Sequence, residues 1–278
     1  MRTYVITGGT DGIGRGLGLH WLGRGDRVIA IASGAEKGAA FLSEATRLGA
    51  ADRAHFLRAD LGTRAGTNRV LTEVPTLTDT VDGLVFGAQH FRPERVETVD
   101  GFESTFALAY LSRYILGHGL VPLLEAAPAP VIMNIAGPGG LPGTIAWDDL
   151  QLRADYRGMR AAMQASRCID LLGIHFPQRH PGARTRYVLY NPMFTRTSMA
   201  DSLPTVQRLV SKAAAVLFAQ SVAKAIVPVV ELVDIPPYAP VSAFRRRTPI
   251  PLTGKDFDPD AARRLDAVTA ALLAETTA

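Results

Sequence analysis

The fold is decided by a short stretch near the N-terminus, TYVITGGTDGIGRGLG, residues 3–18. Its first part is a continuous, largely apolar run, which is typical of a strand buried on both faces. Several glycines follow, and residues 13–24 then have the pattern of a helix that ends at Gly25. Glycine lets the backbone turn sharply and approach a pyrophosphate closely, while a helix N-terminus offers free N–H groups. The order strand, glycine loop and helix therefore predicts a dinucleotide-binding site.

Strands and helices alternate along the rest of the chain. Short apolar strands are predicted at RVIAIA, AHFLRADL, GLVFGAQ, PVIMNIAG, TRYVLYNP and PVSAFRR. Helices are predicted over residues 36–48, 102–125, 156–176, 211–232 and 259–274. This alternation is typical of a parallel sheet with helices on both faces, and no linker interrupts it. We therefore predict an α/β fold, a Rossmann-type doubly wound parallel sheet, in a single domain over residues 1–278.

Composition narrows the class of protein. The chain has 278 residues, of which 47% are hydrophobic, so it can bury a sizeable core. It has no apolar run long enough for a membrane span, and its start, MRTYVITGG, leads straight into a strand without a signal-peptide pattern. Cys168 is the single cysteine, which excludes an internal disulfide and suits a reducing compartment. We expect a cytoplasmic protein without a membrane partner.

Charge and motifs exclude further classes. The net charge of +4 is scattered, and the run Arg245–Arg247 is expected at a solvated turn or strand edge. We therefore predict no nucleic-acid partner. The sequence contains no metal-ligand spacing and no nucleophile elbow, so no metal site is predicted. The expected partner is a small-molecule substrate.

The motif Gly8-x-x-x-Gly12-Ile13-Gly14 resembles the cofactor loop of the short-chain dehydrogenase/reductase family. The expected strand order and helix lengths agree with that family over nearly the whole chain. The resemblance implies that an acidic residue past the third strand contacts the adenine, and that a proline and a threonine follow the sixth strand near the nicotinamide. The predicted cofactor-binding residues are Gly8, Thr10, Gly12, Ile13, Gly14, Ser33, Asp60, Leu61, Ala88, Pro192 and Thr197.

The resemblance also carries expectations for the surroundings of the site. Met193 stands where the family usually has glycine after the proline. Residues 194–210 are expected to form a lid over the substrate. Family members commonly form homo-oligomers through the long helices after the fourth and fifth strands, so a homo-oligomer is expected here as well.

The end of the second strand, Ala32-Ser33-Gly34, bears on the choice of cofactor. NAD-binding proteins usually carry an acidic residue there, which bonds the ribose hydroxyls. Without that carboxylate a 2′-phosphate is not repelled, and Lys37 or Arg15 is expected within reach of it. We predict NADP over NAD, although the arginine that the family usually has at the Ser33 position is missing.

The resemblance implies a catalytic tetrad: a tyrosine, a lysine four positions later, a serine after the fifth strand and an asparagine in the long helix before it. Tyr156 matches the tyrosine, and Arg160 replaces the lysine because no lysine lies within residues 38–211. The serine position falls on Ala-Gly at residues 136–137, and the asparagine position on Ala109. The chain is predicted to be a divergent member in which Tyr156 is the acid/base and Arg160 lowers its pKa.

Several residues and functions stay open at this point. Thr144 is a candidate for the serine's place or a simple turn residue, and His90 a candidate acid/base or a structural histidine. Asn134 is expected to bond across the sheet or to a neighbouring loop. The first hypothesis is an NAD(P)H-dependent oxidoreductase acting on a small carbonyl or alcohol. The alternatives are a redox-neutral dehydratase, cyclase or isomerase on the same fold, and a non-catalytic nucleotide-sensing protein.

Overall fold

The computed structural model describes residues 1–139, 142–193 and 221–275. One sheet has the strand order β3-β2-β1-β4-β5-β6-β7-β8, in which β1 to β7 are parallel and β8 pairs antiparallel with β7. The strands are β1 Thr3–Thr7, β2 Arg27–Ala32, β3 Ala54–Arg58, β4 Gly83–Phe86, β5 Val131–Ile135, β6 Arg186–Asn191, β7 Val241–Arg245 and β8 Thr248–Ile250. The predicted α/β, Rossmann-type doubly wound sheet is confirmed.

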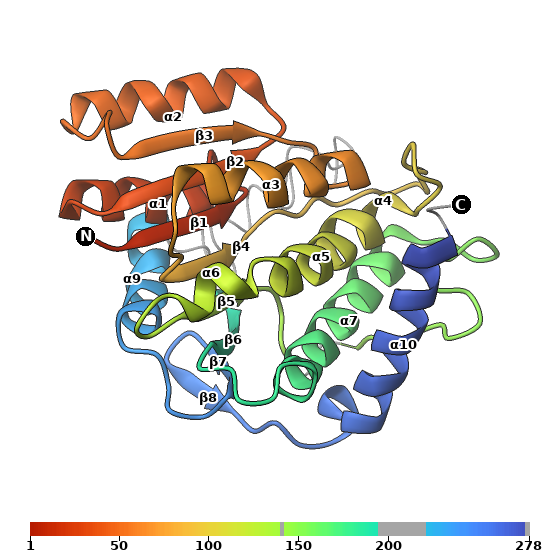
Figure 1. Ribbon diagram of the computed structural model, residues 1–278. Coiled ribbons are helices and arrows are strands. Elements are labelled where there is room, and N and C mark those ends of the chain that lie inside the picture. The colour runs from red at the N-terminus through yellow and green to blue at the C-terminus, as the bar shows by residue number, and fades with distance from the viewer. Residues whose placement is uncertain (140–141, 194–220, 276–278) are drawn as a thin grey trace.

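Helices cover both faces of the sheet, as Figure 1 shows. They are α1 Gly12–Arg24, α2 Ala35–Arg47, α3 Arg64–Leu77, α4 Ser104–Phe106, α5 Ser112–Gly119, α6 Val121–Glu125, α7 Gly158–Arg179, α9 Val222–Asp234 and α10 Pro259–Glu275, with the π-helix η1 Ala107–Leu111 and the 3-10 turn η3 Lys255–Phe257. One apolar core lies under α1, α2 and α9, and the other under α3, α5, α7 and α10. Along each buried strand, alternate residues place their side chains in one core or the other, because successive side chains point to opposite faces of the sheet.

The predicted helix over residues 102–125 is broken into four pieces, α4, η1, α5 and α6. Glu103 caps α4 by accepting the backbone N–H groups of Thr105 and Phe106 at 2.8 and 2.7 Å. The π-helix η1 follows, and after α5 the helix α6 carries Pro122 in its first turn, a position that suits proline. The apolar pattern that predicted one helix is shared by all four pieces, so it does not reveal the breaks.

The predicted helix over residues 156–176 is wrong at its start, because α7 begins at Gly158 and leaves Tyr156 in the preceding loop. Asp149 explains part of this, since its carboxylate accepts the backbone N–H groups of Arg153 and Ala154 at 2.9 and 3.0 Å and favours a local turn.

α3 and β8 were not predicted. The pattern of α3 is weak, with Gly66 and Pro75 inside it, and only its Thr63 cap is a clear signal.

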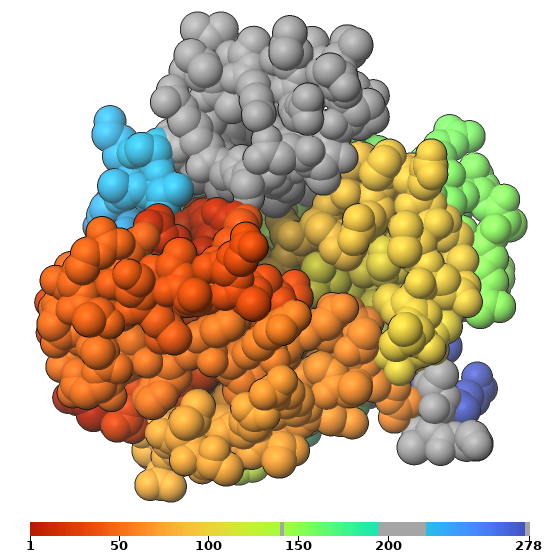
Figure 2. All heavy atoms as spheres, turned by 90° about the horizontal axis from the view of Figure 1, so that it is seen from above, coloured from red at the N-terminus to blue at the C-terminus, as the bar shows by residue number. Residues whose placement is uncertain are grey.

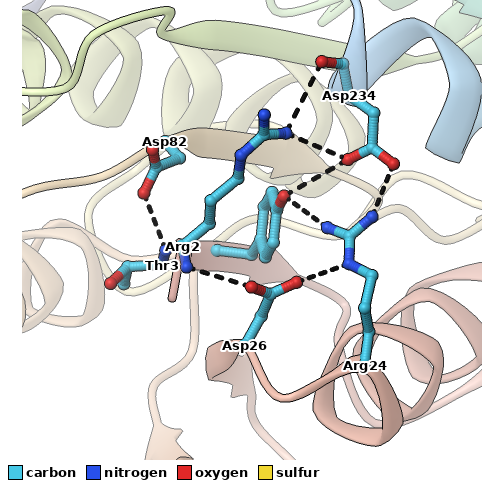
Figure 3. Close-up of polar contacts among 7 residues, drawn as sticks. Arg2, Thr3, Arg24, Asp26, Asp82 and Asp234 are labelled. Atoms are coloured by element: carbon cyan, nitrogen blue, oxygen red, sulfur yellow. Dashed lines mark hydrogen bonds and ion pairs between the residues drawn. The ribbon is translucent and has the colours of Figure 1, made fainter.

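Charged residues close the amino end of the sheet (Figure 3). Asp26 accepts the backbone N–H of Arg2 at 3.0 Å and the Nε of Arg24 at 2.6 Å. Asp234, at the end of α9, pairs with both arginines, and Arg24 also donates to the Tyr4 hydroxyl at 2.8 Å. This amino-end cluster, Arg2, Tyr4, Arg24, Asp26 and Asp234, ties α1 and α9 to β1.

Within the part of the chain that the structure describes, no helix combines the length and the apolarity that a membrane crossing requires.

Candidate cofactor site

The loop between β1 and α1 has a shape that only glycine permits. Gly8 and Gly12 have φ angles of 69° and 51°, in the left-handed region that other residues rarely adopt. A Cβ on Gly14 would lie 2.3 Å from the Gly8 carbonyl oxygen, and one on Gly8 would lie 2.9 Å from the Ala88 nitrogen. Asp11 caps α1 by accepting the Gly12 N–H at 2.7 Å. The structure thus brings Gly8, Gly12 and Gly14 together with Ala88 at the start of α1.

The other predicted cofactor residues lie along the same edge. The register pairs the last residues of β1, β2, β3 and β4 with one another, so the loops that follow them are neighbours. Ser33 and Asp60 are exposed just after β2 and β3, whereas Thr10 and Leu61 are buried and Ile13 is half-buried against the core. The carboxyl ends of parallel strands are where such sheets bind ligands. Figure 2 shows these N-terminal elements, in red and orange, beside the yellow segment that follows β4.

The two cations expected near a 2′-phosphate are both engaged with carboxylates. Arg15 pairs with Glu44 of α2, and Lys37 pairs with Asp11. Arg58, which sequence reasoning missed, ends β3 opposite Ala32, and its Nε lies 3.2 Å from the Ser33 carbonyl oxygen. Among the described residues Arg58 has no ion-pair partner. The sequence could have indicated Arg58 by its position, because it lies two residues before Asp60, at the end of the strand next to β2.

At the end of β6 the backbone adopts a left-handed conformation that favours glycine. Met193 has a φ of 61°, and its N–H donates to the Asn191 side chain at 2.7 Å. Pro192 lies between them, at the carboxyl edge. Thr197 and the predicted lid over residues 194–210 lie outside the described residues.

Tyr156 and Arg160 do not form the predicted pair. The Tyr156 hydroxyl donates to the Arg92 carbonyl oxygen at 2.9 Å, and burial raises the pKa of Tyr156. Arg160 donates to the Asp155 carbonyl and carboxylate, both at 2.9 Å. The expectation that Arg160 lowers the pKa of Tyr156 is therefore wrong, because its charge is directed to Asp155. A catalytic role for the two residues stays a prediction.

Side chains of α7, including Ser166, reach the loop after β5, whereas Tyr156 lies before the helix. The Ser166 hydroxyl donates at 3.2 Å to the carbonyl of Gly137, one of the two residues at the expected serine position. α7 rises about 12 Å between Gly158 and Ser166, at 1.5 Å per residue. At Ser166 the helix is thus more than two turns beyond its N-terminus at Gly158, whereas Tyr156 lies before that N-terminus.

The open candidates differ in their surroundings. Burial, followed by the nearby Arg92, lowers the pKa of His90 to about 4, so its half-buried ring is neutral at pH 7. Its buried Nε2 has no hydrogen-bond partner among the described residues. Thr144 is exposed in its loop. Asn134 donates to the Tyr187 hydroxyl on β6 at 2.9 Å, which confirms the expected bond across the sheet. Within the described ranges no cluster of His, Cys, Asp or Glu could hold a metal ion.

Comparison with known proteins adds to this geometry. The family model described as short chain dehydrogenase matches residues 2–148. A rhamnolipids biosynthesis 3-oxoacyl-[acyl-carrier-protein] reductase from Pseudomonas aeruginosa is 30% identical over 211 residues, which are 72% of this chain and 81% of the relative. The chain belongs to the short-chain dehydrogenase family.

Other family members are more distant or longer. Oxidoreductase AN1596 from Emericella nidulans is 30% identical over 189 residues, 64% of this chain, and polyprenol dehydrogenase from Homo sapiens is 26% identical over 194 residues, 68% of this chain. The match spans only 54% and 58% of these two relatives.

Two solved structures show the same fold. A Pseudomonas aeruginosa RhlG/NADP active-site complex aligns with a TM-score of 0.65 at 21% identity, covering 88% of this chain and 94% of that one. A short chain dehydrogenase from Shigella flexneri complexed with NADP aligns with a TM-score of 0.65 at 17% identity, covering 88% and 97%.

Proposed function

We propose that this chain is an NADP(H)-dependent oxidoreductase that acts on a small carbonyl or alcohol. The observation that carries the proposal is the glycine loop, where a Cβ on Gly14 would collide with the Gly8 carbonyl at 2.3 Å. Such close backbone packing leaves room for a pyrophosphate over the start of α1. The loop residues Gly8, Thr10, Gly12, Ile13 and Gly14 would hold the dinucleotide. When bound, it supplies the hydride chemistry.

NADP is favoured over NAD by the charges around Ser33. Ser33 and Gly34, directly after β2, provide no carboxylate, and the Arg58 guanidinium lies beside the Ser33 carbonyl. A guanidinium is well suited to bind a phosphate through two parallel hydrogen bonds. The solved relatives with NADP are consistent with this choice. We infer that Arg58, rather than Arg15 or Lys37, binds the 2′-phosphate.

The catalytic tetrad is proposed to be degenerate. Ala109 and Gly137 carry no hydroxyl or amide side chain, and Arg160 cannot shuttle a proton because a guanidinium stays protonated. The contacts of Tyr156 with Arg92 do not support a role as the acid/base. His90, just after β4, is neutral at pH 7, and its Nε2 has no hydrogen-bond partner among the described residues, so it can form a hydrogen bond with a reacting group there.

A redox-neutral reaction on the same fold is the second candidate, favoured by the same missing side chains. It would keep the dinucleotide for structure or do without it. Cytoplasmic location and a homo-oligomer stay predictions. The helix α7, expected at that interface, is packed against α10 of the same chain. The Thr269 hydroxyl of α10 also lies 2.8 Å from that of Tyr110 in η1.

The test is a fluorescence titration of the full chain with NADPH and, separately, NADH. NADPH is expected to bind more tightly, and Arg58→Gln to weaken NADPH about tenfold with little effect on NADH. Arg47→Gln is the matched control, since this exposed arginine lies at the far end of α2. Absence of binding by both reduced and both oxidised dinucleotides contradicts the redox proposal. Equal loss for NADPH and NADH in Arg58→Gln contradicts the assignment of Arg58.

A further inference from the structure

Arg113, on α5, is a buried charge that has no carboxylate partner among the described residues. Its side chain is among the largest fully buried ones, and the residue is 1% exposed. Within the described residues it takes part in no ion pair, and its Nε has no hydrogen-bond partner. Burial lowers the pKa of Arg113 to about 10, which leaves it charged at neutral pH.

The guanidinium of Arg113 joins the carboxyl ends of two neighbouring strands. Its Nη2 donates to the carbonyl oxygens of Ala88, just after β4, and of Ile135, the last residue of β5, at 3.3 and 3.4 Å. Its Nη1 donates to the Ala109 carbonyl at 2.7 Å. Ala88 is also the residue that a Cβ on Gly8 would meet. The positive charge therefore lies directly beneath the edge that carries the glycine loop.

The π-helix η1 lies directly before α5 and supplies one of the carbonyls that Arg113 contacts. In η1 the helix is wider than an α-helix, and the carbonyls of Leu108 and Ala109 accept side-chain donors from Ser112 and Arg113. π-turns inside helices are frequent at functional sites. Ala109 is the position where the family resemblance implies the tetrad asparagine, so the guanidinium reaches the same turn of the chain that would carry that residue.

Packing alone does not account for Arg113. Taking a guanidinium out of water is costly, and hydrogen bonds to three carbonyls compensate for it only in part. An apolar side chain of similar length would fill the same space between α5 and the sheet at lower cost. A buried charge with no counter-ion among the described residues, beside the proposed cofactor site, points to an electrostatic role in that site.

We propose that Arg113 is a positioning residue that sets a positive potential beneath the nicotinamide end of the cofactor site, so that the site favours the reduced dinucleotide and a substrate oxygen that gains negative charge. This inference rests on the proposed function and extends it, since it predicts that the reduced dinucleotide is the form that preferentially occupies the site. The oxidised nicotinamide ring is cationic and the reduced ring is neutral. A fixed positive charge near a ring bound at this edge would therefore disfavour the oxidised form.

The experiment compares the dissociation constants of NADP⁺ and NADPH for the full chain and for Arg113→Met, Arg113→Gln and Arg113→Lys. The unaltered chain is expected to bind NADPH more tightly than NADP⁺. Both neutral variants should reduce that ratio by about tenfold, while Arg113→Lys should keep most of it. Urea unfolding should show that Arg113→Met is at least as stable as the unaltered chain, because a buried charge has been removed. Arg24→Met, in the amino-end cluster, should leave the ratio unchanged.

Two outcomes overturn the inference. If the neutral variants fold and lose affinity for both forms equally, or lose none, the guanidinium acts only through its hydrogen bonds. If neither neutral variant folds, Arg113 is required by the fold itself. Failure of the proposed function has a different signature, since the unaltered chain then binds neither form.

Discussion

Charged side chains at the amino end of the sheet pair with one another, whereas two arginines at the carboxyl end, Arg58 and Arg113, bond to carbonyl oxygens instead. In the amino-end cluster, Asp26 and Asp234 satisfy Arg2 and Arg24 (Figure 3). At the carboxyl end, Arg58 and Arg113 have no carboxylate partner in the described ranges. The two arrangements indicate different tasks. Mutual pairing stabilises the fold. At the carboxyl end, charges that are not neutralised by a carboxylate provide an electrostatic potential for a ligand, and the glycine turns leave space for it.

The largest expected effect comes from adding one methyl group at the carboxyl end. In Gly14→Ala the new Cβ would lie 2.3 Å from the Gly8 carbonyl oxygen, a backbone atom that cannot move without reshaping the loop. We expect dinucleotide affinity to fall about 100-fold or more, and the free energy of unfolding to fall by about 1–3 kcal/mol. Fluorescence titration and urea unfolding measure the two effects.

Gly23→Ala is the control in the same helix. A Cβ there has no atom within 4 Å, so the variant should bind normally and gain about 0.5–1 kcal/mol from helix propensity. If Gly14→Ala binds the dinucleotide as tightly as the unaltered chain, the contrast between the two ends is contradicted, because the glycine loop would no longer indicate a ligand site at the carboxyl edge.

Acid sensitivity is expected at the amino end. The His118 Nδ1 lies 2.8 Å from the His180 Nε2, and burial, followed by the nearby Arg179, lowers the pKa of His118 to about 3. Since the unfolded chain takes up this proton near pH 6.5, it binds more protons than the folded chain between about pH 6.5 and 3. Stability from His118 is therefore complete above pH 6.5 and is lost as the pH falls through that range.

His118→Gln should reduce this acid loss by an amount on the order of 3 kcal/mol, measured by urea unfolding at a series of pH values. His20→Gln, on the exposed surface of α1, serves as the control and should leave the profile unchanged. Identical pH profiles for the unaltered chain and His118→Gln would show that the acid-labile element lies elsewhere.

The smallest expected effect concerns the ion pairs of the amino end. Asp26→Asn weakens the bonds to the Arg2 N–H and the Arg24 guanidinium and should lower the free energy of unfolding by about 1–2 kcal/mol. Asp260→Asn, which removes an exposed pair with Arg263, should cost less than about 0.5 kcal/mol. Thermal and urea unfolding compare them. Dinucleotide affinity should not change in either variant, and a tenfold loss in Asp26→Asn would contradict the division between the two ends.

Some boundaries were predictable because they depend on neighbours in sequence. The strand at residues 3–7 and the helix from Gly12 to Arg24 follow from an apolar run, a glycine loop and a left-handed Gly25. The start of α7 did not follow, because it depends on Gly158 packing against the Arg92 carbonyl, where a Cβ would lie only 2.2 Å away. No local pattern encodes a contact with a segment more than sixty residues earlier in the chain.

The sequence by itself therefore determined the sheet, the glycine loop and the family, since periodicity and the steric freedom of glycine act over a few residues. Only the tertiary structure decided which charges are engaged. It pairs Arg160 with Asp155 and Arg15 with Glu44, and it places Arg113 beneath β4 and β5 without a carboxylate. The physical reason is that an ion pair or a pKa depends on distance and burial in space, and both are created when remote parts of the chain pack together.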